Sequence, residues 1–200
     1  MFSKISLLQC ALLIGIALFS SCKKDSNDTP NTPQAEYYFS AKLDGQSVRY
    51  EIDASGKVQM SNSIDASIDP PACTYSYGCS MGLAEPEDSP YFEVYFPDLF
   101  VGDCGDVHQT FSSLFHKDLY GYGTGSGEVL IRYWDGTELW AAYPSGQENA
   151  IFEVTGSERT ETPFGVYQKV SGRANCLLFN FNGDSKKLED IKFVMSFSEQ

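Results

Sequence analysis

Alternation of apolar and polar residues is the dominant pattern in residues 36–200. It is clearest in residues 191–198, where large apolar side chains are separated by smaller or polar ones. Successive side chains of a β-strand point to opposite faces, so this period of two predicts a strand with one buried face. Residues 128–143 repeat the pattern on both sides of residues 135–137, whose Asp-Gly-Thr sequence predicts the turn of a hairpin.

The same reading applies along most of this region. Residues 37–43 and 48–52 alternate around Asp44-Gly45, which predicts a second hairpin. Further strands are expected at residues 57–60, 74–81, 91–96, 150–154 and 166–181. One segment, residues 110–119, has helical spacing, with Thr110 as a candidate N-cap and Phe111, Leu114 and Phe115 on one face. About ten strands with one short helix predict an all-β protein, an antiparallel β-sandwich or a barrel-like sandwich.

The beginning of the chain follows a different pattern. Lys4 is the only charge before Cys22, residues 5–19 are almost continuously apolar, and two serines precede the cysteine. This resembles the bacterial lipoprotein signal, in which the Cys thiol carries a fatty acid such as palmitate and cleavage falls just before it. An ordinary signal peptide and an N-terminal membrane anchor are the alternatives, but the apolar run is short for a span of about 20 residues. The resemblance implies a signal peptide over residues 1–21 and lipidation of Cys22.

Composition then divides the rest of the chain. Residues 22–35 contain no large apolar side chain and are expected to form a flexible tether, followed by a single β-sandwich domain over residues 36–200. The chain carries 14 Lys+Arg against 27 Asp+Glu, a formal net charge of −13. So negative a protein is not expected to bind nucleic acid, or anionic lipid through charge. Plain solubility explains the excess of acids better than an acid-rich cation site.

Four cysteines follow the candidate lipidation site: Cys73, Cys79, Cys104 and Cys176. An even number outside the cytoplasm predicts two disulfides, with three possible pairings. A local bridge between Cys73 and Cys79 across a turn at Gly78 is favoured, which leaves Cys104 to pair with Cys176. Their spacings do not match the short paired spacings of a zinc site.

Three stretches carry a resemblance to a known group of proteins. Residues 38–45, with the sequence YFSAKLDG, look like the opening strand of many Bacteroidetes lipoproteins. Residues 127–136 are similar to the centre of the same group and residues 170–177 to its last strands, although the group would have Phe at Ala174. It is a lipoprotein domain of unknown function, so the resemblance implies fold and location but no catalytic residue. Residues 23–28 partly match an acidic export tag, which favours an outer-membrane lipoprotein at the cell surface over the periplasmic face.

Candidate chemistry is sparse. A metal or acid–base site could be drawn from four neighbouring residues: Asp103, Asp106, His108 and His116. Their spacing matches no known motif, and a solvated acidic loop is favoured. Ser126 lies between two glycines but lacks the context of a nucleophile elbow. Carboxylates that could serve glycoside hydrolysis, which requires a separation of about 5–10 Å, are Glu85, Glu87, Asp88, Glu128 and Glu138. The sequence therefore predicts no enzyme, no metal and no cofactor.

Four aromatic residues cluster on one expected hairpin: Tyr133, Trp134, Trp140 and Tyr143. Their rings could form a platform for sugars, although aromatic residues at alternating strand positions usually fill a core. The favoured function is a non-catalytic module, held at the membrane through Cys22, that binds a glycan or an envelope protein. The alternatives are a pilus-like adhesion subunit and a glycan-directed hydrolase. An exposed aromatic strip would favour the first, a removable terminal strand or a long unpaired sheet edge the second, and two facing carboxyl groups the third.

Overall fold

The computed structural model describes residues 35–69, 72–102, 107–116 and 118–199, so Cys22 and the leader lie outside the described residues. Within this part, strands dominate and helix is limited to one short element. The elements are β1 (Tyr38–Leu43), β2 (Gln46–Glu51), β3 (Val58–Asp69), β4 (Ala72–Leu83), β5 (Tyr91–Gly102), α2 (Val107–Ser113), β6 (Leu119–Tyr122), β7 (Glu128–Trp134), β8 (Leu139–Ala141), β9 (Ile151–Thr162), β10 (Gly165–Phe179) and β11 (Ser185–Ser198). The predicted all-β fold is confirmed. In the described part of the chain, no helix is long and apolar enough to cross a membrane.

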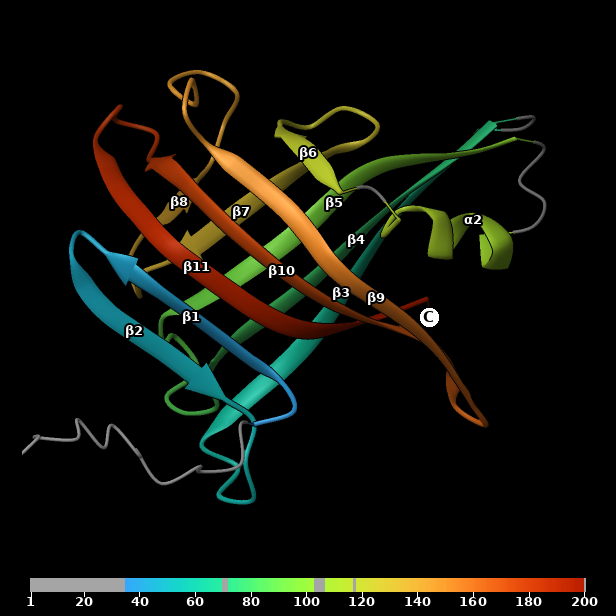
Figure 1. Ribbon diagram of the computed structural model, residues 1–200, viewed down its shortest axis with the longest axis horizontal. Coiled ribbons are helices and arrows are strands. Elements are labelled where there is room, and N and C mark those ends of the chain that lie inside the picture. Colours follow the sequence, from blue (N-terminus) through green and yellow to red (C-terminus); the bar gives the residue numbers. More distant parts are fainter. Residues whose placement is uncertain (1–34, 70–71, 103–106, 117, 200) are drawn as a thin grey trace, which may run out of the picture. The chain divides into compact units, whose positions relative to one another are not determined.

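A single sheet folds over on itself to make both layers of the sandwich. Its strand order is β2-β1-β11-β10-β9-β6-β7-β5-β4-β3, and β8 pairs with both β10 and β7. In Figure 1 the strands β2, β1, β11, β10 and β9 form a front layer that crosses over a back layer of β7, β5, β4 and β3. The short strands β6 and β8 join the layers along one side. Since β6 pairs with β7 in parallel, the sheet is mixed rather than purely antiparallel as expected.

Aromatic side chains fill the space between the layers. The alternation expected for β11 is confirmed, because its apolar positions are buried: Ile191, Phe193, Met195 and Phe197. Phe96 of β5 lies at the centre of the core and meets four other rings edge-on. Their centroids lie 5.1–5.9 Å from that of Phe96, and the partners are Phe115, Tyr120, Phe152 and Phe197. The edges of these rings point at the faces of their neighbours, which is the preferred arrangement of packed aromatics.

The first hairpin forms as the Asp-Gly signal predicts. Asp44 and Gly45 have φ values of 49° and 80°, the positive values that a two-residue turn between twisted strands requires. The Asp44 carboxylate accepts a hydrogen bond of 2.8 Å from the backbone N–H of Lys187. The turn is therefore tied to the start of β11.

Three glycines within strands lie directly opposite aromatic residues. Gly172 is paired with Phe193, Gly82 with Tyr91 and Gly78 with Tyr95. A Cβ atom at Gly172 would lie 2.4 Å from Cζ of Phe193, so the ring occupies the space that a side chain would need. Such pairs let an aromatic ring cover the backbone of a glycine that would otherwise weaken its strand.

The helix begins earlier than predicted. Because α2 starts at Val107, Thr110 lies inside it and is not its N-cap. The apolar face is as expected, since Phe111, Leu114 and Phe115 are all buried. Phe111 packs on Tyr77 of β4 with ring centroids 4.7 Å apart, so the helix is held by its packing against the back layer.

The predicted disulfide pairing is wrong. Cys79 and Cys176 are free and buried, so neither the Cys73–Cys79 bridge nor the Cys104–Cys176 bridge forms. Cys73 is disulfide-bonded, and Cys104 lies outside the described residues. Gly78 makes no turn, because Cys73 and Cys79 both belong to the extended strand β4. Six residues of extended strand separate them by about 20 Å, whereas a disulfide requires Cα atoms within about 7 Å.

The two free thiols are expected to react with alkylating reagents only when the protein unfolds. Burial raises the pKa of Cys176 to about 12 and that of Cys79 still further. Because the folded state binds these protons more tightly than the unfolded state, the resulting stability is fully present below the unfolded pKa of about 8.5. It is lost as the pH rises from there toward the folded values.

Urea unfolding between pH 7 and pH 10 measures this effect, and stability should fall with rising pH. A Cys79→Ala, Cys176→Ala double variant is the control, and its stability should fall less steeply over the same range. Alkylation of the native protein at the rate seen in urea would contradict the burial of both thiols.

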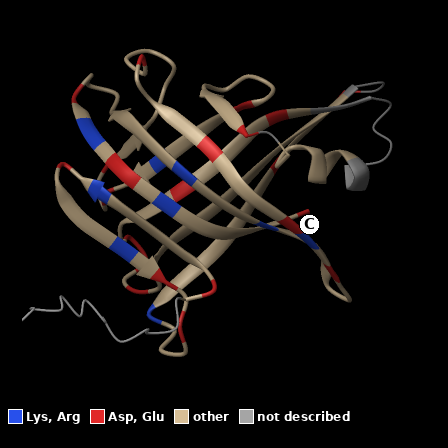
Figure 2. Ribbon diagram, in the orientation of Figure 1, with Lys and Arg blue, Asp and Glu red and all other residues tan. Residues whose placement is uncertain are grey.

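Charged side chains on the outer face of the front layer are arranged in pairs of opposite sign (Figure 2). The ion pairs are Lys42–Asp190, Arg49–Glu51, Lys169–Glu36, Arg173–Glu153 and Lys187–Glu189. Most of these groups are well exposed, so each pair contributes little to stability. This face is a solvated surface of alternating charge.

Candidate functional site

The structure divides the four aromatic residues of the β7–β8 hairpin. Tyr133 and Trp140 lie opposite each other and point into the sandwich, where Tyr133 stacks on the buried Phe92 with ring centroids 4.5 Å apart. Trp140 is only 5% exposed. Trp134, the neighbour of Tyr133, points to the outer face, and Tyr143 is exposed beyond the end of β8. These four residues therefore do not share one surface.

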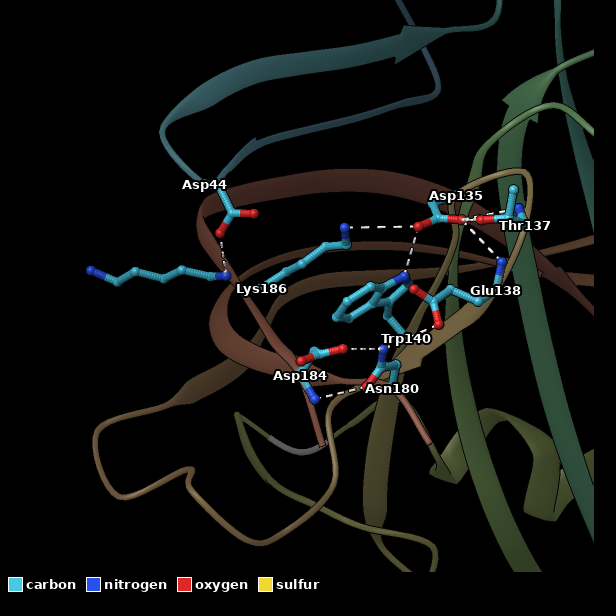
Figure 3. Close-up of polar contacts among 9 residues, drawn as sticks. Asp44, Asp135, Thr137, Glu138, Trp140, Asn180, Asp184 and Lys186 are labelled. Atoms are coloured by element: carbon cyan, nitrogen blue, oxygen red, sulfur yellow. Dashed lines mark hydrogen bonds and ion pairs between the residues drawn. The ribbon is translucent and has the colours of Figure 1, made fainter. Parts of the chain in front are cut away.

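Trp140 belongs to a polar network that joins two turns (Figure 3). Its indole N–H donates a hydrogen bond of 2.8 Å to Asp135, and the ammonium of Lys186 lies 3.9 Å from the centre of its ring. Burial alone would raise the pKa of Asp135, but hydrogen bonds from Thr137, Glu138 and Trp140 outweigh it and hold the pKa well below its usual range. Asp135 therefore stays ionised and fixes the β7–β8 turn, which is a structural role.

The other half of the network is centred on Asn180. Its side-chain amide donates hydrogen bonds of 3.1 Å to Glu138 and to Asp184, which links the β7–β8 turn to the β10–β11 turn. The carboxylate of Glu138 is thus engaged with a neighbouring turn. The network holds this end of the sandwich together, and the carboxylates of Glu138 and Asp184 are both engaged by the Asn180 amide.

Trp134 has an aromatic partner on β5 rather than on its own hairpin. Tyr91 is directly opposite Trp134, and in the next outward row Glu93 is directly opposite Arg132. Arg132 Nη1 lies 3.2 Å from Glu93 Oε2, and the guanidinium lies 4.0 Å from the centre of the Tyr95 ring. We call Tyr91, Glu93, Tyr95, Arg132 and Trp134 the aromatic strip. Tyr91 and Trp134 are both partly exposed, so their rings are accessible from outside.

Small residues border the aromatic strip on the outer face of the back layer. The outward positions of β4 next to it are Gly78, Ser80 and Gly82, and β3 contributes Ser61 and Ser63 beyond them. Ser63 donates a hydrogen bond of 3.0 Å to Glu93 across Gly78, where a side chain would collide with both groups. Large rings therefore stand beside a low surface of glycines and hydroxyl groups.

Two tyrosine hydroxyl groups of the strip keep their protons at physiological pH. Burial, followed by the charge of Glu93, raises the pKa of Tyr91, and burial is also the main cause that raises the pKa of Tyr95. The Tyr95 hydroxyl donates a hydrogen bond of 3.0 Å to the Asp65 carboxylate. The strip thus combines aromatic faces with neutral hydroxyl groups and one guanidinium–carboxylate pair.

The candidate catalytic groups are not brought together. Glu128 opens β7, where it accepts a hydrogen bond of 2.7 Å from the N–H of Gly125, whereas Glu138 follows the turn at the other end. The strand between them keeps the two carboxylates about 20 Å apart, too far for glycoside hydrolysis. Ser126 is exposed in a turn, and the loop between β4 and β5 exposes its three acids: Glu85, Glu87 and Asp88.

Only part of the predicted cluster of histidine and aspartate residues lies within the described residues. His116 is exposed and lines a small pocket of about 220 Å³ with Asp118 and Ser157. Asp103, Asp106 and the side chain of His108 lie outside the described residues. Among the residues that are described, no three His, Cys, Asp or Glu side chains are placed to hold a metal ion.

A separate pocket of about 390 Å³ is lined by residues 146–150 and by parts of β10 and β11. Gln147 holds the loop there, because its side-chain amide donates a hydrogen bond of 2.6 Å to the C=O of Leu177 and accepts one of 3.1 Å from its N–H. The amide thus replaces β9, which pairs with β10 only as far as Asn175. Lys187 and Glu189, which also line the pocket, are paired with each other.

Comparison of the chain with known protein families, with curated proteins and with solved structures gave no match. The class of the protein, an all-β sandwich, is therefore defined by its strand topology. The aromatic strip is the feature that distinguishes its surface. Sequence reasoning found Trp134 but missed Tyr91, Glu93, Tyr95 and Arg132, although residues 91–95 alternate in the same way as residues 130–134.

Proposed function

We propose that this protein is a lipid-anchored cell-envelope protein whose β-sandwich binds glycan chains without catalysis. The observation that carries the proposal is the pair of partly exposed rings, Tyr91 and Trp134, beside the Glu93–Arg132 ion pair. Aromatic faces stack on the apolar faces of sugar rings, and charged groups nearby can bind their hydroxyl groups. The anchor is proposed from Cys22 and its leader, with the outer membrane as location and the cell surface favoured over its periplasmic side.

Binding is preferred to hydrolysis because the candidate carboxylates are engaged or far apart. Glu138 is bound to Asn180, Glu93 is bound to Arg132, and Glu128 lies at the opposite end of β7 from Glu138. A hydrolase would require two carboxyl groups facing each other across a cleft. The three acids of the β4–β5 loop are exposed, which is typical of a solvated loop.

An adhesion or pilus-like subunit is a second candidate, supported by one observation. Within the described residues β3 pairs with β4 alone, so one side of a strand of 12 residues is unpaired. Such an edge can accept a strand from another chain. However, neither terminal strand is removable, because β1 lies between β2 and β11, and β11 lies between β1 and β10.

Glycan-array binding by the compact unit Ala35–Gln200 tests the proposal, and binding to at least one family of glycans is expected. In the same assay Trp134→Ala should weaken binding at least tenfold, because large aromatic residues at the centre of a binding surface each contribute about 2 kcal/mol or more. Its unfolding midpoint should stay close to that of the wild type, since Trp134 lies on the outer face.

Phe181→Ala is the matched control, because Phe181 is an aromatic residue 91% exposed in the β10–β11 turn and outside the strip. It should bind as the wild type does. Absence of binding across the array, or equal binding by the Trp134→Ala variant, would argue against glycan binding by the strip. In the first case the adhesion candidate would gain support.

A further inference from the structure

The one guanidinium of the aromatic strip is already satisfied on two sides. Arg132 lies 3.2 Å from the Glu93 carboxylate and stacks over the ring of Tyr95 at 4.0 Å. Its side chain is 29% exposed, and that of Glu93 is 12% exposed. A charge pair this well shielded from water is stronger than a fully exposed one. Arg132 is therefore held by the protein rather than presented to a ligand as an unpaired cation.

Carboxylates outnumber cations around the strip. The second oxygen of Glu93 accepts the hydrogen bond from Ser63, and Asp65 accepts the hydrogen bond from Tyr95. Two carboxylates and one guanidinium are thus engaged with residues of the strip, in a chain whose formal net charge is −13. The potential over this surface is negative, which opposes the approach of polyanions.

Acidic and neutral sugars would meet this surface differently. A uronate or sulfate would have to separate Arg132 from Glu93, and the Glu93 carboxylate would then remain beside a second negative charge without its partner. Separating the two partners of a shielded charge pair lowers the affinity for the ligand that separates them, because the charge left behind is no longer compensated. A neutral sugar carries hydroxyl groups, which can donate to the existing carboxylates without disturbing the pair.

We infer that the aromatic strip selects neutral glycan chains and rejects acidic ones, with the Glu93–Arg132 pair as the determinant of this selectivity. The inference rests on the proposed glycan-binding function and goes beyond it by naming the class of ligand. Stacking on Tyr91 and Trp134 supplies affinity for sugar rings in general. Glu93 decides which rings are accepted.

Calorimetric titration of the full mature protein in detergent tests this selectivity. The probes are two sets of oligosaccharides of equal length, neutral glucan or mannan fragments and oligogalacturonates. The wild type should bind at least one neutral oligosaccharide tenfold more tightly than any oligogalacturonate. Glu93→Gln removes one negative charge and releases Arg132, so it should weaken neutral binding and raise the affinity for oligogalacturonate at least tenfold.

Glu36→Gln is the matched control, because Glu36 is also paired with a cation, Lys169, but belongs to the N-terminal approach to the front layer. It changes the total charge by the same amount and should leave the preference unchanged. Glu93→Asp keeps the charge, and it should retain the neutral preference even if its shorter side chain lowers affinity. Circular dichroism establishes whether each variant is folded. If Glu93→Gln does not fold, the comparison of Glu93→Asp with the wild type tests the role of the Glu93 charge in selectivity.

The outcomes separate the inference from the function on which it rests. Tighter wild-type binding of oligogalacturonate would overturn the neutral selectivity while leaving glycan binding in place. The same conclusion would follow if Glu93→Gln behaved like Glu36→Gln, or if Glu93→Asp lost the preference. Failure of the wild type to bind any oligosaccharide, here and on the array, would instead remove the proposed function.

Discussion

Replacement of Phe96 by alanine is expected to lower the free energy of unfolding by about 3–5 kcal/mol. Phe96 is 1% exposed and forms edge-on contacts with four rings, which belong to the turn after α2, to β6, to β9 and to β11. Removal of the ring would leave a cavity that both layers line, and the crossing strands restrict how far they can move to fill it. Equilibrium unfolding in urea measures the loss directly.

Phe164→Ala is the control for the Phe96 experiment. Phe164 is 83% exposed in the turn between β9 and β10, so its replacement should change stability by no more than about 0.5 kcal/mol. A loss below about 1 kcal/mol for Phe96→Ala would contradict the tight packing of these rings. Both variants carry the same chemical change, so the difference between them reports burial alone.

Introduction of a single methyl group at Gly172 is expected to destabilise the protein by about 1–3 kcal/mol. In Gly172→Ala the new Cβ would lie 2.4 Å from Cζ of Phe193 and 2.8 Å from the backbone oxygen of Glu153. The ring is buried and the oxygen belongs to the neighbouring strand, so neither can move aside without disturbing the front layer. Thermal unfolding followed by circular dichroism would show a lower midpoint.

Gly121→Ala provides the comparison, because a Cβ at Gly121 of β6 meets no atom within 4 Å and its φ is not positive. There alanine should be neutral or slightly stabilising, since it reduces the conformational freedom of the unfolded chain. Equal destabilisation by both substitutions would mean that the cost is a general property of strand glycines. It would then not arise from the contact with Phe193.

The sequence pattern predicted strands correctly where one face of the strand is buried, because burial requires apolar residues at alternate positions. The alternation of residues 191–198 and the Asp44-Gly45 turn both appear as expected, because one face of β11 is buried and the turn needs positive φ. The second half of β3 was missed. Apart from Ile64 and Ile68, residues 61–69 are small or polar, and almost all of them are exposed. Pairing with β4, rather than burial of their side chains, therefore holds them in the strand.

Long-range pairing explains what the sequence could not predict about the site. Tyr91 and Trp134 meet because β5 and β7 are neighbours, yet α2 and β6 separate these strands along the chain. Local alternation assigns a residue to a face of its own strand but does not say which strand lies beside it. The same gap led to the error at Cys73 and Cys79, where closeness in sequence was taken for closeness in space.

The pairing of the first strand with the last has a consequence for how the protein is made. Tyr38 of β1 lies opposite Val194 of β11, and in the described part of the chain β1 pairs only with β11 and β2. The front layer is therefore incomplete until the ribosome has released almost the entire chain. Topologies of such high contact order fold slowly, because a long loop must close before its contacts form. We therefore expect the front layer to be completed only after β11 has been synthesised, whereas the locally paired strands β3, β4 and β5 do not depend on it.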